Sequence, residues 1–243
     1  GAFANTGLTE INLPDGLKSV GKDAFETIAI ETNEDGSNYA VELKPENMYE
    51  VRIPKSLKSI GREAFASASR IYADSFDKQL ILACKDDART ETKYRTKFCL
   101  IKIGDRPEII VPKTIYGIVD WIVDRIYDFL NSKREIPPAL VYQYGINGSI
   151  LINESVLSAS MEYCRRYHDA DVEQFMAKNV RKILQIGMYD LETLIEYINA
   201  GTFNDETLRQ MLDMADEIFG PDAITLKGYI LNKLNKKSET FTL

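Results

Sequence analysis

The stretch LPDGLKSVGKDAF at residues 13–25 returns 40 positions later, at residues 53–65, as IPKSLKSIGREAF. Both copies hold an apolar residue before proline, then a leucine, a branched residue before glycine, and a final Ala-Phe pair at the same spacing. A more divergent copy begins at Val111-Pro112 without the glycine and the Ala-Phe pair, and Ala2-Phe3 resembles the end of an earlier copy. One such unit cannot bury its own apolar face, so the repeat predicts units that stack on one another.

Each full copy begins with an alternation of apolar and polar residues. Asn12 lies between two apolar residues, and Arg52 lies between two others at the equivalent place. This alternation predicts short strands with one buried face, which end at the proline because proline cannot donate to a strand ladder. Further along each copy, we expect Gly21 and Gly61 to allow a backbone bend that other residues cannot adopt. The phenylalanine of each copy is expected to fill the far side of the unit.

This motif resembles the BspA-type leucine-rich repeat, a repeat of bacterial proteins. The resemblance covers about residues 1–70, with a weaker echo at residues 109–119. It implies a short solenoid of stacked repeats whose surface binds other proteins. The prolines at positions 14, 54 and 112 are further apart than one such repeat, so additional chain must lie between the repeats.

The additional chain is predicted to form two β-hairpins. Strand-like residues 27–31 and 39–43 flank an Asp-Gly pair, which is a strong hairpin signal. Two further strand-like segments, at residues 78–84 and 97–103, are joined by the charged residues 85–96. We interpret that connection as a solvent-exposed hairpin tip, with a binding loop as the alternative.

Beyond residue 112 the apolar residues recur three or four positions apart, which is the period of a helix. The pattern predicts helices over residues 115–130, 153–166 and 171–186. Gly187 follows the last of these and is expected to be its C-terminal cap.

The last 55 residues carry three more helical stripes. The first stripe ends at Gly201, and Asn204 is a good N-cap for the second. Gly220-Pro221 then separates the second stripe from a last one over residues 223–234. Short helices with short connections are expected to pack as antiparallel neighbours.

Residues 190–201 and 227–235 loosely resemble helices of an ankyrin-like array, although the Thr-Pro-Leu-His motif of true ankyrin repeats is absent. We therefore predict an α+β chain of two parts. Residues 1–112 form a short leucine-rich-repeat solenoid with hairpin insertions, and residues 113–243 form an all-α region. Because an open solenoid end would expose its core to water, we expect the helical region to cap the last repeat.

The composition excludes several classes of function. The chain has 243 residues, of which 44% are hydrophobic, and a net charge of −7, which argues against a general nucleic-acid binder. No apolar stretch is long enough to span a membrane. The one locally basic stretch, residues 89–102 with Lys93, Arg95 and Lys97, has acidic neighbours. A nucleic-acid site there is the less favoured interpretation.

The few cysteines and the single histidine limit the possible chemistry. Cys84, Cys99 and Cys164 lack the paired spacing of a zinc site, so no metal or other cofactor is expected. We interpret all three as reduced thiols, mostly buried, and leave a Cys84–Cys99 disulfide open. Cys164 and His168 could share a helix face, but no third catalytic group or oxyanion loop accompanies them. We expect His168 to be exposed at a helix end, and the chain not to be an enzyme.

These observations favour a protein-binding module of a bacterial leucine-rich-repeat protein. The outward-facing strand residues form the candidate contact surface, and they are Glu10, Asn12, Glu50, Arg52 and Glu108. One alternative is a cell-surface protein that adheres to a host. Another is an architectural role for the repeats, with a peptide-binding surface in the helical region.

The sequence leaves the partner and the oligomeric state unidentified. BspA-type repeats resemble those of surface-exposed bacterial proteins, whereas the sparse thiols and the helical tail favour the cytosol. We slightly favour the cytosol. Gly1-Ala2-Phe3 looks like the middle of a repeat, so we expect the chain to be a piece of a longer protein.

Overall fold

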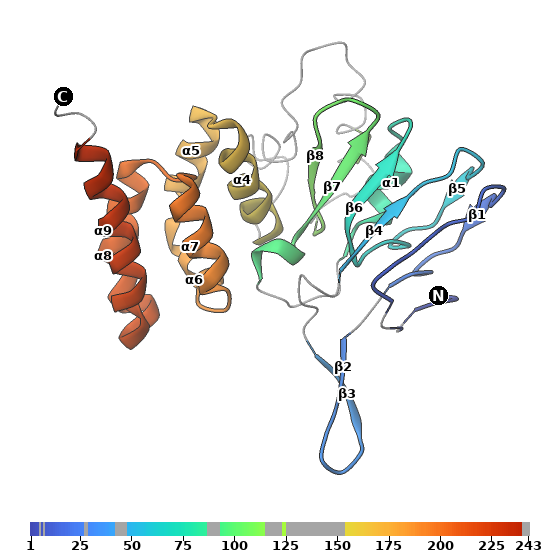
Figure 1. The fold of residues 1–243 in the computed structure, drawn as a ribbon, viewed down its shortest axis with the longest axis horizontal. Coiled ribbons are helices and arrows are strands. Elements are labelled where there is room, and N and C mark those ends of the chain that lie inside the picture. The colour runs from blue at the N-terminus through green and yellow to red at the C-terminus, as the bar shows by residue number, and fades with distance from the viewer. Residues whose placement is uncertain are drawn as a thin grey trace.

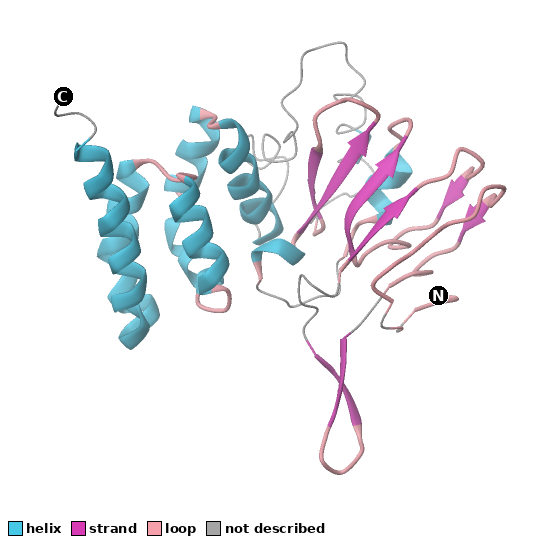
Figure 2. Ribbon diagram, viewed as in Figure 1, coloured by secondary structure: helices cyan, strands magenta, loops and turns pink. Residues whose placement is uncertain are grey.

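The structure is a computed structural model, and it describes residues 1–4, 6, 8–26, 29–41, 48–86, 93–114, 123–124 and 154–239. For residues 29–32, 38–41 and 236–239 it describes the backbone alone. The strands lie in the N-terminal part and a row of helices lies beside them (Figure 1). Figure 2 shows the same division by type of secondary structure. The chain therefore has the α+β content that the sequence predicts.

Parallel pairing links successive repeats. The main sheet contains β4 (Tyr49–Arg52), β6 (Ala68–Ala73), β7 (Phe98–Ile103) and β8 (Ile109–Pro112), in that order. The first three strands are parallel, and β8 is antiparallel to β7. A parallel bridge between Ile11 and Val51 joins the first repeat to this sheet. Along β4 the side chains alternate between buried and exposed, as the alternation around Arg52 predicts.

A ladder of phenylalanines forms a second line of contact between the repeats. The ring of Phe25 lies 5.2 Å from that of Phe3 and 5.8 Å from that of Phe65, with nearly parallel planes. The backbone N–H of Phe25 donates to the Ala64 carbonyl at 3.0 Å. Nearby, β1 (Ser19–Val20) pairs in parallel with β5 (Ser59–Ile60). The equivalent phenylalanines of the motif therefore stack on one another, as the repeat predicts.

The glycines of the motif have a different role from the predicted one. Neither Gly21 nor Gly61 has a positive φ; the equivalent residues with a positive φ in the two copies are Asp23 (53°) and Glu63 (59°), and Gly16 (97°) adds one in the first copy. Gly61 is instead required by close approach, because a Cβ there would lie 2.3 Å from the backbone nitrogen of Lys22. The glycine thus brings the backbones of two repeats together, and the bend follows two residues later.

The first predicted hairpin is confirmed. β2 (Ala29–Thr32) pairs antiparallel with β3 (Asn38–Val41), and Gly36 in the turn has a φ of 83°. The Asp35 carboxylate accepts a hydrogen bond from the Ser37 backbone N–H at 2.8 Å. In Figure 1 this hairpin projects away from the sheet.

The prediction of the second hairpin is wrong. Residues Lys78–Ala83 form a helix, α1, whose N-cap Asp77 accepts from the Gln79 backbone N–H at 2.7 Å. β7 pairs with β6 and β8 instead of with this segment. A short apolar run does not distinguish a strand from a buried helix by its period, and Leu80 and Ile81 are both buried here. Within the predicted connection, residues 87–92 lie outside the described residues.

The described residues from 154 to 239 form a series of helices. They are α4 (Glu154–Tyr167), α5 (Ala170–Ala177), α6 (Val180–Gly187), α7 (Leu191–Ala200), α8 (Asp205–Phe219) and α9 (Ala223–Glu239). Gly201, with a φ of 81°, ends α7, and the Asn204 side chain caps α8 by accepting from the Thr207 backbone N–H at 2.9 Å. Both caps confirm the prediction. Apart from residues 123–124, the predicted helix over residues 115–130 lies outside the described residues.

Two helix predictions need correction. The helix expected over residues 171–186 is divided between α5 and α6, and the break is stabilised by the Asn179 side chain, which donates to the Phe175 carbonyl at 2.8 Å. Gly187 does not have the left-handed conformation of a C-terminal cap. It is the buried last residue of α6, where a Cβ would lie 2.5 Å from Leu194 Cδ2. Its function is therefore to let α7 approach closely.

The helical part packs directly against the last strands. α4 lies against β7 and β8, and the Thr114 backbone N–H donates to the Ser155 hydroxyl at 3.2 Å. The short 3-10 helix η2 (Tyr94–Thr96) begins with Tyr94, which is fully buried. The Tyr94 hydroxyl donates a hydrogen bond to the Ile183 carbonyl. One apolar core therefore runs from the repeats into the helices. The boundary at residue 112 and the ankyrin-like character of the helices remain predictions.

Candidate interaction surface

The strand register places exposed side chains of neighbouring strands next to one another. Glu50 on β4 pairs with Arg70 on β6, and Arg52 pairs with Tyr72 in the next outward-facing row. Tyr72 in turn lies beside Lys102 on β7. We call this surface the strand face; its residues are Glu10, Asn12, Glu50, Arg52, Arg70, Tyr72 and Lys102.

Four of the five predicted contact residues belong to the strand face and are exposed. In the first repeat the Asn12 side chain donates to the Glu10 carboxylate at 3.1 Å. In the next, the Arg52 guanidinium lies over the Tyr72 ring at 4.9 Å from its centre. Glu50 forms an ion pair with Arg70 and accepts from the Tyr72 hydroxyl at 2.8 Å. The strand face thus carries ordered charges of both signs.

Glu108, the fifth predicted residue, has a different environment. Its side chain is only 18% exposed, and it accepts from Arg70 Nε at 2.6 Å and from Arg166 Nη1 at 2.8 Å. Burial would raise the pKa of Glu108, but the hydrogen bonds and positive charges of Arg166 and Arg70 outweigh it and lower the pKa. Glu108 therefore joins the sheet to α4.

The sequence reasoning missed a second carboxylate, on α4. Glu162, whose side chain is 7% exposed, accepts from Arg165 Nε at 2.9 Å and from Arg166 Nε at 2.7 Å. The Tyr197 hydroxyl of α7 donates to the same carboxylate at 3.3 Å. The positions of the two arginines, three and four residues after a glutamate, are the local signal that could have revealed this cluster.

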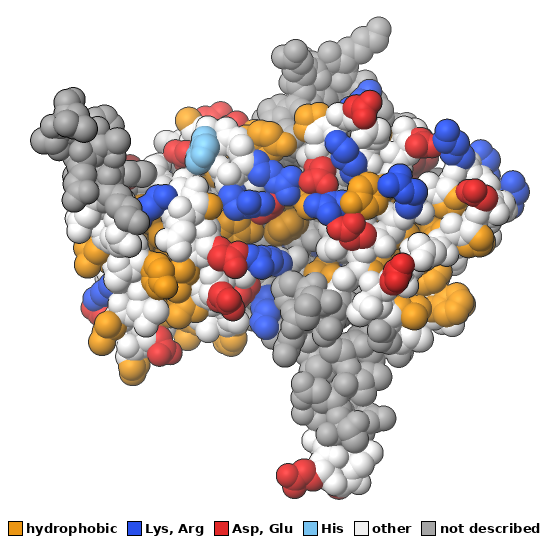
Figure 3. Space-filling model, in the orientation of Figure 1, with side chains coloured by type: hydrophobic (Ala, Val, Ile, Leu, Met, Phe, Trp, Pro, Cys, Tyr) orange, Lys and Arg blue, Asp and Glu red, His pale blue; other side chains and the backbone are white. Residues whose placement is uncertain are grey.

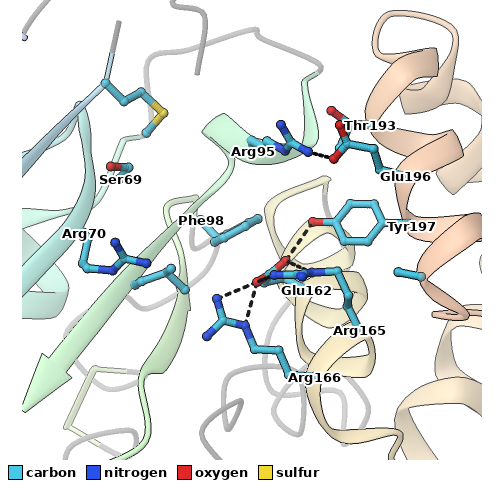
Figure 4. Close-up of a pocket in the computed structure, with 13 residues that line it drawn as sticks. Ser69, Arg70, Arg95, Phe98, Glu162, Arg165, Arg166, Thr193, Glu196 and Tyr197 are labelled. Atoms are coloured by element: carbon cyan, nitrogen blue, oxygen red, sulfur yellow. Dashed lines mark hydrogen bonds and ion pairs between the residues drawn. The ribbon is translucent and has the colours of Figure 1, made fainter. Parts of the chain in front are cut away.

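These residues line a cleft of about 510 Å³ between the sheet and the helices. The arginines of the cleft are Arg70, Arg95, Arg165 and Arg166, and buried Phe98 and Leu100 supply apolar surface. Figure 4 shows Phe98 between Arg70 on the strand side and Glu162 on the helix side. In Figure 3, Lys and Arg side chains gather on this face, over the junction of strands and helices. We call this feature the arginine cleft.

Basic side chains of the stretch around Arg95 form ion pairs with acidic residues of the helices. Arg95 pairs with Glu196 of α7, and Lys97, which is buried, has its Nζ 3.4 Å from the Glu154 carboxylate. These cations connect η2 and its flank to the helices.

The three cysteines are free and buried. The hydrogen bond that the Cys84 thiol donates to the neighbouring Cys99 sulfur, together with burial, raises the pKa of Cys84. Burial raises the pKa of Cys164 to about 12, so this thiol is protonated near neutral pH. His168 is exposed and ends α4 with a φ of 49°. A nucleophile needs thiolate character, so Cys164 and His168 do not have the properties of a catalytic pair.

Two features are absent from the described residues. No group of three or more His, Cys, Asp and Glu residues there could hold a metal ion. Within the same ranges, no helix has both the length and the apolar character needed to cross a bilayer.

Comparison with known proteins finds a similarity in the N-terminal repeats. A family model for the BspA type leucine rich repeat region, with 6 copies, matches residues 1–80. No curated protein and no solved structure matches the chain. Residues 1–80 are therefore similar to the BspA type leucine rich repeat region, while β7, β8 and the helices lie beyond the matched segment.

Proposed function

We propose that this chain is a non-catalytic protein-interaction module that binds its partner mainly through the strand face. The register of the parallel strands carries this proposal, because it sets polar side chains of successive repeats in adjacent rows. The BspA-type match over residues 1–80 supports it as well, since stacked repeats form extended binding surfaces. We propose that the repeats of this chain form a short solenoid.

The chemistry of the strand face suits a protein partner. Arginine and tyrosine are enriched where proteins bind one another, and Arg52 stacked on Tyr72 offers both at one place. The mixture of acidic and basic side chains favours a partner with complementary charges. Binding through such a surface weakens as salt is added.

A triple charge reversal tests this function. Glu10→Lys, Glu50→Lys and Arg52→Glu together invert the pattern of the exposed strand face. Proteins captured from the source cells by the whole chain are quantified by mass spectrometry, and circular dichroism establishes that each variant folds. We expect the captured partner to be lost from the triple variant and released from the wild type by salt.

A matched control exchanges charges elsewhere. Arg181 and Glu217 form an exposed ion pair between α6 and α8, at 2.7 Å. The double variant Arg181→Glu, Glu217→Arg keeps the pair and reverses its direction, so it should keep the partner. A partner that is bound equally well by the triple variant overturns the proposal.

A second candidate function places the binding surface on the helices, with the repeats in an architectural role. It is favoured by the apolar side chains that α9 exposes, with Ile224 81% and Leu231 48% exposed. Because α4 covers β7 and β8, deleting the helices would expose the core. The double variant Ile224→Gln, Leu231→Gln is the better test, and loss of the partner from it alone would assign binding to α9.

Adhesion at a cell surface is the same binding function in another compartment. It would use the strand face against a host protein. Antibody labelling of intact source cells distinguishes the two compartments, because only a surface-exposed chain is stained without permeabilisation.

A further inference from the structure

Two arginines of the arginine cleft are more exposed than carboxylates with which they pair. The Arg165 side chain is 43% exposed, while its partner Glu162 is 7% exposed. Arg70 is 28% exposed, and its partner Glu108 is 18% exposed. In these two pairs the guanidinium is the more exposed group. The other carboxylate partners, Glu50 of Arg70 and Glu196 of Arg95, are exposed beside the arginines.

The same contacts fix the arginines in place. Arg165 binds Glu162 through two nitrogens, Nε at 2.9 Å and Nη2 at 2.6 Å. Arg166 is held between Glu162 and Glu108. A guanidinium that is already ordered loses less conformational freedom when it binds a ligand, so the site is preorganised.

The cleft also offers apolar surface and space. Phe98 and Leu100 of β7 lie among its lining residues, and its volume of about 510 Å³ is within the usual range of a ligand pocket. Arg70 belongs to both the cleft and the strand face, so the two surfaces are continuous. A partner lying across the strand face can extend into the cleft.

We propose that the arginine cleft binds an acidic segment of a partner protein. Carboxylates of the segment pair with the outer edges of Arg165 and Arg70, and an apolar side chain between them rests on Phe98 and Leu100. This inference rests on the proposed function and names the chemistry of the partner. An arginine fork is suited to a carboxylate because it can donate two parallel hydrogen bonds.

A nucleic acid fits this site less well than a short acidic peptide. The chain has a net charge of −7, and the acidic residues Glu50 and Glu196 flank the arginines on the two sides of the cleft. A polyanion would meet these charges along its length, whereas a segment with two carboxylates need meet only the arginines.

The test uses the whole chain labelled with nitrogen-15 and three capped peptides. The first is Gly-Glu-Leu-Glu-Gly; in the second glutamine replaces each glutamate, and in the third phosphoserine does. The arginine Nε–H signals are followed by NMR during each titration. We expect saturable shifts of the Arg70 and Arg165 signals with the glutamate peptide, and binding about tenfold weaker with the glutamine peptide.

Two variants complete the experiment. Arg165→Gln should weaken binding of the glutamate peptide about tenfold, whereas Arg181→Gln, which removes the same charge from an exposed ion pair on α6, should leave it unchanged. Should Arg165→Gln fail to fold, the wild-type titration alone decides, because the arginine signals report directly on the cleft.

Three results would overturn the assignment to an acidic segment. They are an absence of shifts with the glutamate peptide, equal shifts at Arg181, and binding of the phosphoserine peptide alone. None of these three results tests whether a partner binds to the strand face. If the triple reversal of Glu10, Glu50 and Arg52 removes the partner while Arg165→Gln keeps it, the proposed function stands and this inference fails.

Discussion

Arg166 on α4 donates to Glu108 at 2.8 Å, and Glu108 also accepts from Arg70 on β6. A single carboxylate from the turn before β8 thus connects the repeat strands to the first described helix of the C-terminal half. The connection is polar and only 18% exposed on the glutamate side. Its removal should weaken the junction at which the two parts of the chain meet.

Glu108→Gln should lower the free energy of unfolding by about 1–3 kcal/mol, because it removes charge-assisted hydrogen bonds and takes from Arg70 and Arg166 one of the two carboxylates that each contacts. Chemical denaturation measures this loss. Glu217→Gln, which breaks a fully exposed ion pair on α8, is the control and should change stability by no measurable amount. Equal effects of the two variants would show that Glu108 has no special role at the junction.

The contribution of Glu108 should depend on pH in a defined direction. Its pKa in the folded chain is lowered from the ordinary value of 4.5, so the folded state favours the ionised form. The stabilisation is fully present above 4.5 and is lost as the pH falls through the lowered pKa. The difference in unfolding free energy between wild type and Glu108→Gln should therefore be constant near neutrality and shrink below 4.5. A difference that grows on acidification would contradict this sign.

Gly61→Ala should destabilise the repeats, by about 1–3 kcal/mol, because its Cβ would lie 2.3 Å from the Lys22 backbone nitrogen and neither backbone can move freely. Gly21→Ala is the matched control, since a Cβ at Gly21 has no atom within 4 Å. Thermal unfolding of both variants distinguishes close approach from backbone bending. If bending were the reason for the motif glycine, both substitutions would be equally harmful.

Cys164 should react slowly with thiol reagents at neutral pH, because its pKa is about 12 and its side chain is buried. Its alkylation is expected to follow the unfolding of the chain and to become rapid in denaturant. Mass spectrometry of the Cys164 peptide measures the rate, with Cys164→Ser to establish the assignment. Rapid modification of Cys164 in the folded chain would contradict this prediction and would favour a reactive Cys164–His168 pair.

Local patterns predict local structure well in this chain. The spacing of the motif predicted that the units stack, the Asp-Gly pair predicted the β2–β3 hairpin, and Asn204 predicted the start of α8. Each of these depends on residues close in sequence or repeated at a fixed offset. The prediction of a strand at residues 78–84 was wrong because it rested on the apolar run alone. Asp77, which precedes the run, is the N-cap of α1.

The arginine cleft could not be predicted in the same way. Arg70 lies in β6, outside both copies of the motif, and it meets Arg166 across Glu108 only because α4 packs against β7 and β8. No sequence pattern links residues so far apart. Glu108 illustrates the limit. It was predicted to be an outward-facing strand residue, but it lies just before β8, and the sequence does not show that arginines from β6 and α4 pair with it.

In the phenylalanine ladder, the distance between successive rings does not depend on the number of residues between them. Phe3 and Phe25 are 22 positions apart and Phe25 and Phe65 are 40 apart, yet the ring distances are 5.2 and 5.8 Å. The longer interval includes the β2–β3 hairpin, which projects away from the sheet (Figure 1). Chain inserted at that hairpin does not alter the rise from one rung to the next. The hairpin tip is accordingly a position where a foreign peptide could be grafted, or a natural insertion tolerated, while the pitch of the stack is preserved.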